Sequence, residues 1–212
     1  MVEESKELDF YYTIEDFVRD EIKVRGSKFI ASVSPAKTKE EAHEFLATMR
    51  AEFYDATHNC YAYQIGERGL DFRAADDGEP NGSAGKPILY AIKKFDYKDV
   101  IVVVTRYFGG TKLGVGGLVR AYSDAAELAL GQAKKKKIDL TLPVKINCTY
   151  EDIDVIKRMV GETAVSFEEH YSDAIEILAN IHRSKAKRFC DNITTQTRAR
   201  AGAVILNQEV TE

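Results

Sequence analysis

The sequence has few cysteines and no long hydrophobic segment. Its three cysteines, Cys60, Cys148 and Cys190, are far apart and form no CxxC pair. This pattern suggests neither a disulfide framework nor a zinc site, so we expect reduced core residues. No stretch reaches the roughly 18 uninterrupted apolar residues that a membrane-spanning helix needs. The acidic start, MVEESKELDFYY, lacks the features of a secretory signal, so we expect a cytoplasmic location.

The sequence also lacks an overall positive charge. With 30 Lys and Arg against 34 Asp and Glu, its formal net charge is −4. This balance argues against a globally basic nucleic-acid-binding protein, so any anion-binding site must be local. The 212 residues, of which 44% are hydrophobic, are enough for one large domain or two small ones.

A change in composition at residues 131–143, GQAKKKKIDLTLP, divides the chain. Successive lysines repel one another and a proline follows, which indicates the end of a helix and a linker. We therefore predict an N-terminal domain over residues 1–133, a linker over residues 134–142 and a C-terminal domain over residues 143–212.

Hydrophobic periodicity predicts both helices and strands in each domain. In the first domain we expect strands at 8–14, 27–34, 59–66, 70–75 and 99–108, helices at 38–55 and 83–95, and a last helix that carries Leu118 and Tyr122 on one face. In the second domain we expect strands at 144–150, 164–171, 174–181 and 202–206, and helices at 151–160 and 184–197. The second order, β-α-β-β-α-β, is the ferredoxin-like pattern.

An unusual glycine-rich segment follows a buried strand. In VVVTRYFGGTKLGVGGLVRAY, residues 102–122, five glycines are surrounded by Arg106, Lys112 and Arg120. Bare backbone that leads into the positive end of a helix dipole is typical of phosphate and carboxylate sites. The segment therefore predicts an anion-binding site. The alternative is that the glycines only allow a helix to pack closely on a strand.

A second unusual segment, AADDGEPNGSAGKP, contains Asp76, Asp77 and Glu79. Three carboxylates are able to hold a hard cation or to act as acid and base, although the alternating pattern of an EF-hand is absent. The preferred interpretation is a turn whose carboxylates pair with arginines such as Arg106 or Arg120, because clustered like charges need compensation. In that case part of the predicted anion site is already neutralised.

Other charged residues have competing interpretations. Arg120 precedes Asp124 by four residues, a spacing that also fits an ion-paired helix surface. His58 is a candidate general base, but a structural histidine is favoured because no nucleophile has a recognisable signature. Residues 183–200 hold six basic residues against the single acid Asp191. They are compatible with RNA contact, although a solvated charged surface is preferred.

The two unusual segments strongly resemble those of the Impact/YigZ family, over residues from about 20 to 130. The remainder is similar to the small C-terminal domain of bacterial YigZ-type members. The resemblance implies an α+β chain with an N-terminal ribosomal protein S5 domain 2-like fold and a C-terminal ferredoxin-like domain, similar to the last domain of elongation factor G. Several relatives of the S5-like fold bind RNA or ribosomes. Eukaryotic family members regulate translation under amino-acid starvation by competing for an activator of a stress-responsive kinase.

We therefore expect a translation-linked regulatory or binding module that contacts RNA, another polyanion or a ribosome-associated partner through a glycine-rich basic groove. The alternatives are an enzyme that acts on a small anionic metabolite or peptide with a divalent metal, and a protein-interaction adaptor. We assign no catalytic residue, metal ligand or cofactor, favour a non-enzymatic role, and expect no membrane partner. The residues predicted for anion or nucleic-acid binding are Lys86, Arg106, Gly109, Gly110, Lys112, Gly114, Gly117 and Arg120; the acidic motif is Asp76, Asp77 and Glu79, with His58, Tyr107 and Tyr122 as auxiliary residues.

Overall fold

The computed structural model describes residues 7–172 and 174–206, which combine helices with antiparallel sheets in an α+β chain. The chain divides into two compact units. Residues 11–138 form the N-terminal unit, and residues 139–206 together with residues 7–10 form the C-terminal unit. The outermost residues of the two predicted domains, 1–6 and 207–212, lie outside the described residues. Across the described ranges, no helix is long and apolar enough to cross a bilayer.

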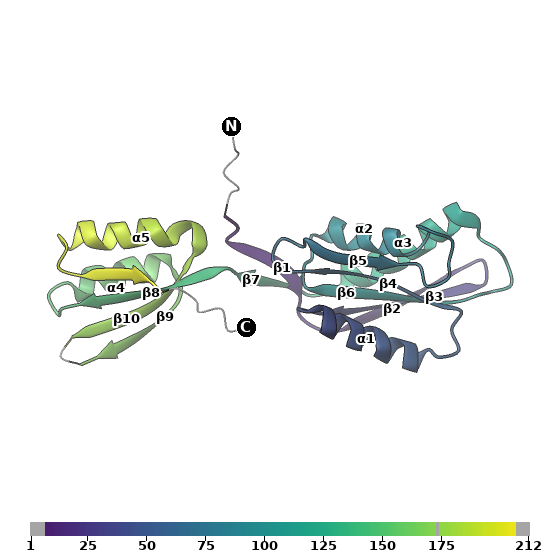
Figure 1. The fold of residues 1–212 in the computed structure, drawn as a ribbon, viewed down its shortest axis with the longest axis horizontal. Coiled ribbons are helices and arrows are strands. Elements are labelled where there is room, and N and C mark those ends of the chain that lie inside the picture. The colour runs from purple at the N-terminus through teal and green to yellow at the C-terminus, as the bar shows by residue number, and fades with distance from the viewer. Residues whose placement is uncertain (1–6, 173, 207–212) are drawn as a thin grey trace, which may run out of the picture. The chain divides into compact units, whose positions relative to one another are not determined.

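The N-terminal unit is built on a five-stranded antiparallel sheet (Figure 1). In spatial order its strands are β2 (Val18–Val24), β3 (Ser27–Pro35), β6 (Val100–Tyr107), β4 (His58–Ile65) and β5 (Asp71–Ala75). Arg106 of β6 is paired with Phe29 of β3 on one side and with His58 of β4 on the other. The end of β6 therefore lies between the starts of β3 and β4, and this placement sets the position of the candidate site.

Helices cover both faces of this sheet because its central strand is apolar on both sides. The helices are α1 (Lys39–Glu52), α2 (Gly85–Phe95) and α3 (Gly114–Gln132). Val102 and Val104 of β6 pack in one buried cluster with α2 and α3, whereas Ile101 and Val103 pack in another with α1. Figure 1 shows α2 and α3 on one side of the sheet and α1 on the other.

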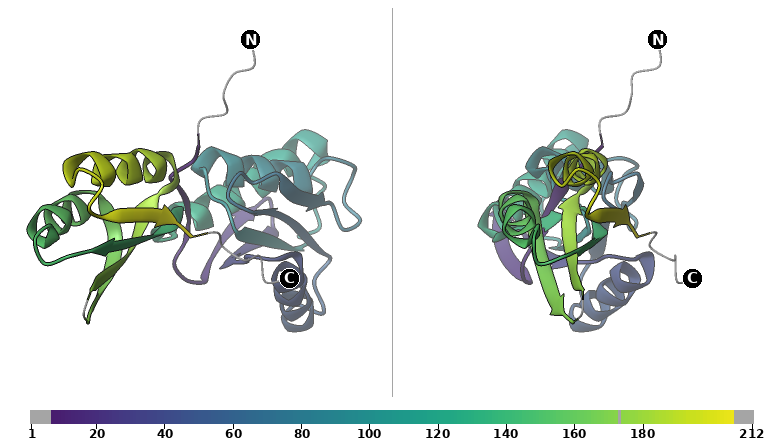
Figure 2. Two further views of the ribbon diagram at one scale, coloured as in Figure 1. Left: turned by 60° about the vertical axis from the view of Figure 1, so that its left-hand side comes forward. Right: turned by 90° about the vertical axis from the view of Figure 1, so that its left-hand side faces the viewer.

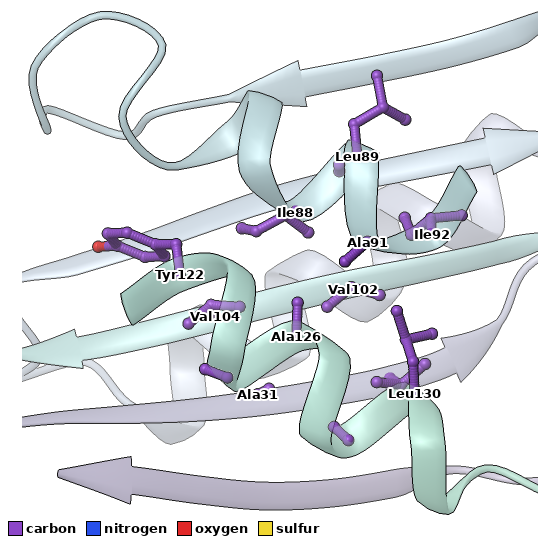
Figure 3. Packing of buried hydrophobic residues seen from close by; sticks show 14 of the residues in the cluster. Ala31, Ile88, Leu89, Ala91, Ile92, Val102, Val104, Tyr122, Ala126 and Leu130 are labelled. Atoms are coloured by element: carbon purple, nitrogen blue, oxygen red, sulfur yellow. The ribbon is translucent and has the colours of Figure 1, made fainter. Parts of the chain in front are cut away.

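Small side chains let α2 and α3 pack closely on the sheet. Ala91 of α2 and Ala121, Ala125, Ala126 and Ala129 of α3 are at most 1% exposed. Figure 3 shows the apolar side chains of both helices gathered against the valines of β6. The predicted face of the last helix is therefore buried, as its periodicity indicated.

The C-terminal unit has a four-stranded antiparallel sheet with both of its helices on one face (Figure 2). Its elements are β8 (Thr141–Cys148), α4 (Ile153–Thr163), β9 (Ala164–Tyr171), β10 (Ile175–His182), α5 (Arg183–Gln196) and β11 (Gly202–Ile205). In space the strands follow the order β11-β8-β10-β9. Alternate residues of β10 are fully buried beneath the helices, so the observed element order is the β-α-β-β-α-β order read from the sequence.

Two strands differ from the sequence prediction. The unpredicted strand β2 has polar residues at three successive positions, 19–21, so it lacks the alternation that marks a half-buried strand. The strand β7 (Lys135–Asp139) occupies much of the predicted linker and pairs with β1 (Phe10–Ile14). The Lys135 ammonium lies 3.8 Å from the centroid of the Tyr12 ring, a cation–π contact that holds part of the lysine run in this strand.

We expect Ala126→Leu to lower the free energy of unfolding by about 1 to 3 kcal/mol, because the larger side chain has no space between α3 and the sheet. Ala47→Leu is the matched control, since it adds the same side chain at an exposed position of α1. The control should change stability by less than about 0.5 kcal/mol. Urea denaturation followed by circular dichroism measures both, and equal stability of the two variants would contradict the close packing of α3.

Candidate functional site

The glycine-rich loop between β6 and α3 packs against the turn that joins β2 to β3. Gly109 lies so close to this turn that a Cβ on Gly109 would stand 1.8 Å from the carbonyl carbon of Gly26. The Gly109 amide donates to Ser27 Oγ at 3.1 Å, and the Phe108 amide donates to Thr57 Oγ1 at 3.1 Å. The first part of the loop is thus held by internal hydrogen bonds.

The other glycines of the glycine-rich segment, in the loop and in the first turn of α3, have different structural explanations. Gly110 and Gly114 have φ angles of 84° and 70°, which other residues adopt only with strain. Gly116 has no positive φ, and no atom lies within 4 Å of a Cβ built on it. Glycine costs about 1 kcal/mol relative to alanine within a helix. Neither packing nor backbone conformation therefore explains Gly116.

Arg106 forms a buried ion pair with Glu79 at the end of β6. Its Nη1 donates to Glu79 Oε1 at 2.6 Å, and the two side chains are 7% and 4% exposed. The Tyr122 hydroxyl of α3 donates to the same oxygen at 2.8 Å. The Nη2 of Arg106 lies 3.4 Å from the Oγ of Ser27, the first residue of β3. Arg106 is therefore an internal residue whose charge Glu79 balances, and it is not one of the exposed cations of the loop.

Residues 76–84, which join β5 to α2, form a loop that we call the acidic loop, and Asp76 orders it by accepting backbone hydrogen bonds. Its carboxylate accepts from the amides of Gly82, Ala84 and Gly85 at 2.8, 3.0 and 2.9 Å. Partial burial opposes ionisation, but these three amides and the nearby Lys86 hold the pKa of Asp76 below its ordinary value of 3.8. Because Ala84 cannot cap α2 with its side chain, Asp76 supplies the acceptor for the first amides of this helix.

Asp77 connects the acidic loop to α1 and β4. Its Oδ1 accepts from Arg50 Nη2 at 2.7 Å, and its Oδ2 accepts from the Asn59 amide at 2.7 Å. The Asp77 carbonyl oxygen lies 2.8 Å from His58 Nδ1, and His58 Nε2 lies 3.9 Å from Glu79 Oε1. The acidic motif is thus a turn with internal partners. Glu79 pairs with an arginine that the sequence suggested, whereas Asp77 pairs with Arg50, which it did not.

Three cations lie exposed around the start of α3. They are Arg25 in the β2–β3 turn, Lys112 in the glycine-rich loop and Arg120 on α3. Among the described residues, none of the three forms an ion pair or hydrogen bond. Arg25 has a φ of 46°, a left-handed conformation that residues other than glycine rarely adopt. The loop therefore keeps a local positive charge although Arg106 is neutralised.

A groove of about 400 Å³ lies between the β2–β3 turn and α3, and we call it the α3 groove. Its lining includes Arg25, Gly116, Gly117, Arg120 and Asp124. No ion pair joins Arg120 to Asp124, both of which the structure describes. The groove thus brings together two arginines, one carboxylate and the bare first turn of a helix.

The start of α3 has no side-chain cap. Leu113 occupies the N-cap position and offers no acceptor. Within the described ranges, the amides of residues 110–112 also lack a hydrogen-bond partner. Unpaired amides at a helix start carry a partial positive charge, which adds to the field of the exposed cations.

Other predicted residues lie elsewhere in the unit. Lys86 is exposed on the first turn of α2, beside Gly82, and does not line the α3 groove. The Tyr107 hydroxyl donates to Asp55 at 2.7 Å, and this hydrogen bond raises the pKa of Tyr107 to about 12. Neither residue contributes to the groove, so the predicted set is only partly brought together.

Two potential nucleophiles lie buried beneath the acidic loop. Burial raises the pKa of the Cys60 thiol to about 12, and burial also raises the pKa of Tyr122. Both groups therefore stay protonated at neutral pH and serve as hydrogen-bonding core residues. Within the part of the chain that the structure describes, no group of three or more His, Cys, Asp or Glu side chains is arranged to hold a metal ion.

Sequence reasoning missed Arg25 and Ser27 because it missed strand β2. The signal was the dipeptide Arg25–Gly26, a two-residue turn in which both φ angles are positive. Such a turn joins two antiparallel strands, but asparagine or aspartate is more usual than arginine at its first position. Ser27, the first residue of β3, then contacts both Arg106 and Gly109.

The chain is similar to known proteins over the segments that form this site. The model of the Impact N-terminal domain matches residues 25–130, which span the acidic loop, the glycine-rich loop and most of the α3 groove. IMPACT family member YvyE of Bacillus subtilis is 35% identical over 195 residues, which cover 92% of this chain and 90% of the relative. The chain belongs to the Impact family.

The chain is also similar to a second IMPACT family member and to a solved structure. IMPACT family member YigZ of Escherichia coli is 33% identical over 141 residues, which cover 66% of this chain and 69% of the relative. A solved structure, described as the crystal structure of a hypothetical protein, has a TM-score of 0.64 and 26% sequence identity. That likeness covers 95% of this chain and 100% of the solved one, so it includes elements of both units.

We expect Gly109→Ala and Gly116→Ala to have opposite effects on stability. Gly109→Ala should lower the free energy of unfolding by at least about 2 kcal/mol, because its methyl group meets the backbone of Gly26. Gly116→Ala should raise it by up to about 1 kcal/mol, because the methyl group enters open space in a helix. Urea denaturation of both variants tests this contrast, and destabilisation by Gly116→Ala would contradict the open space around this glycine.

We expect Asp76→Asn to lower the free energy of unfolding by about 2 kcal/mol at pH 7, because the neutral amide loses charge-assisted hydrogen bonds. The folded-state pKa of Asp76 is lowered, so its stabilisation is present above the ordinary value of 3.8 and is lost as the pH falls through the folded-state pKa. The difference in the free energy of unfolding between wild type and variant should therefore become smaller as the pH falls. Urea denaturation at a series of pH values between 3 and 7 measures it.

Asp16→Asn is the control for this series, because Asp16 is exposed and forms no hydrogen bond or ion pair among the described residues. It should change stability by less than about 0.5 kcal/mol at neutral pH. If the free energies of unfolding of the wild type and of Asp76→Asn differ by the same amount over the whole pH series, the charge of Asp76 is excluded as the source of the stabilisation.

Proposed function

We propose that this Impact family chain is a non-enzymatic regulatory module linked to translation, and that it binds RNA through the α3 groove. The proposal is carried by one observation: Arg25 and Arg120 line the groove at an uncapped helix start, Lys112 directly precedes the N-cap residue of that helix, and none of the three forms an ion pair or hydrogen bond among the described residues. Phosphate groups suit such a place, because cations and helix amides both favour negative oxygens.

Backbone strain at Arg25 supports the same role. Its φ of 46° is costly for a residue with a side chain, and the type of turn it occupies favours asparagine or glycine. Contact between the Arg25 guanidinium and a ligand would explain why a strained residue with a side chain lies at the edge of the groove. The single carboxylate of the groove, Asp124, does not cancel the charge of its two arginines, Arg25 and Arg120.

The architecture fits the folds that the family resemblance implies. We assign the N-terminal unit to the S5 domain 2-like fold, on the basis of its five-stranded sheet with α2 and α3 on one face. We assign the C-terminal unit to the ferredoxin-like fold, because its strand order is β11-β8-β10-β9. Relatives of the S5-like fold that bind RNA or ribosomes support the proposal by analogy. A cytoplasmic location and a part in stress responses belong to the same proposal.

The full-length chain should bind a structured RNA hairpin, measured by fluorescence anisotropy, with an affinity that falls as the salt concentration rises. Arg120→Gln and Lys112→Gln should each weaken binding. The plot of log affinity against log salt has a negative slope. For each phosphate that a variant no longer neutralises, this slope should become shallower by about 0.7 to 0.9. The reduction follows from the release of fewer counterions when RNA binds.

Lys37→Gln is the matched control for the RNA experiment. It removes the same charge from an exposed position next to α1, on the opposite face of the sheet from α3. Affinity that is absent in the wild type, or that falls equally in this control, would refute the α3 groove as an RNA site. Partners that stay bound after nuclease treatment at high salt would instead support the adaptor alternative.

A further inference from the structure

A hollow of about 270 Å³ lies above the Glu79–Arg106 pair, and we call it the Phe108 hollow. Phe108, Leu113, Val115 and Leu118 give it largely apolar walls, and Lys112 also lines it. It shares Leu113 with the α3 groove. The hollow and the groove therefore lie against two different faces of the first turns of α3.

The charges at the base of the hollow do not favour an anion inside it. Glu79 balances Arg106, so the pair offers no net positive charge. Phe108 and Val115 are 48% and 57% exposed, so both have apolar surface that a ligand can cover. The Nε of Arg106 is buried without a hydrogen-bond partner among the described residues. The hollow is therefore suited to a flat apolar group with polar atoms on its edge.

The surroundings of the hollow favour a ligand that is anionic outside it. Lys112 lines the hollow, and Arg120 lines the α3 groove on the other face of α3. A nucleotide combines these two requirements, because an aromatic base is joined to a charged phosphate. Bases commonly stack on phenylalanine side chains, and their edges accept and donate hydrogen bonds.

We propose that the Phe108 hollow receives an unstacked base of a single-stranded RNA segment, whose phosphates lie on Lys112 and in the α3 groove. This inference rests on the proposed function and specifies the class of RNA. A regular duplex keeps its bases stacked inside the helix and cannot place one in the hollow. The chain should therefore prefer single strands, loops and bulges to a duplex of equal length.

The absence of tryptophan from the chain gives a direct test. In the full-length Phe108→Trp variant, a single-stranded oligoribonucleotide should quench the new indole fluorescence, and a duplex of equal length should not. Phe72→Trp is the matched control, because Phe72 is 51% exposed on β5, outside both the hollow and the groove. Its fluorescence should be insensitive to either RNA.

Binding measurements provide a second test. Phe108→Ala should lower the affinity for the single strand by about 5-fold to 150-fold, the range that base–aromatic stacking supplies. The salt slope should not change, because no cation is removed. Phe108→Trp should keep the affinity, which separates a loss of stacking from a loss of folding. Phe72→Ala should bind as the wild type does.

The outcomes separate this inference from the proposed function. Equal affinity for single strand and duplex, or an equal loss in Phe72→Ala, would overturn the base-binding hollow. Salt-dependent binding that still requires Arg120 would then leave the proposed function standing. A wild type that binds no RNA of either form would overturn both. Quenching of the Phe108→Trp variant by a free aromatic carboxylate, but not by RNA, would assign the hollow to a small ligand and overturn the inference.

Discussion

The buried ion pair between Glu79 and Arg106 holds together segments that are far apart in the sequence. Glu79 belongs to the acidic loop and Arg106 ends β6, while Tyr122 brings α3 to the same carboxylate oxygen. Ser27 brings the β2–β3 turn to the guanidinium. Removing one partner of a buried pair leaves the other charge uncompensated, at a cost of about 3 to 5 kcal/mol. The exposed cations therefore keep their places because this internal pair fixes the elements that carry them.

The charged residues of the unit thus divide into an internal and an external set. The carboxylates of Asp76, Asp77 and Glu79 accept hydrogen bonds from backbone amides, from arginines or from a tyrosine within the unit. Their negative charge is used to fix the acidic loop, and it is partly cancelled before it reaches the surface. A formal net charge of −4 for the chain is consequently compatible with a positive groove at the start of α3.

Some of these roles could be predicted from the sequence, and others could not. The buried strand β6 and the apolar face of α3 follow from hydrophobic periodicity, and the internal pairing of the acidic motif follows from the need to compensate clustered carboxylates. Periodicity could not decide which arginine is buried. That choice depends on the register that pairs Arg106 with Phe29 and His58. Arg25 stayed hidden because the polar residues of β2 break the alternation that marks a strand.

The glycines of the glycine-rich segment have different structural roles. Gly109 is set by contact with Gly26, and Gly110 by its positive φ, so both are needed even if nothing binds. Gly116 is different, because a methyl group there would meet no atom within 4 Å. Its missing side chain leaves the helix backbone open between Arg25 and Arg120 in the α3 groove. Under the proposed function, the absence of a side chain at Gly116 lets a negatively charged ligand approach the helix backbone between the two arginines.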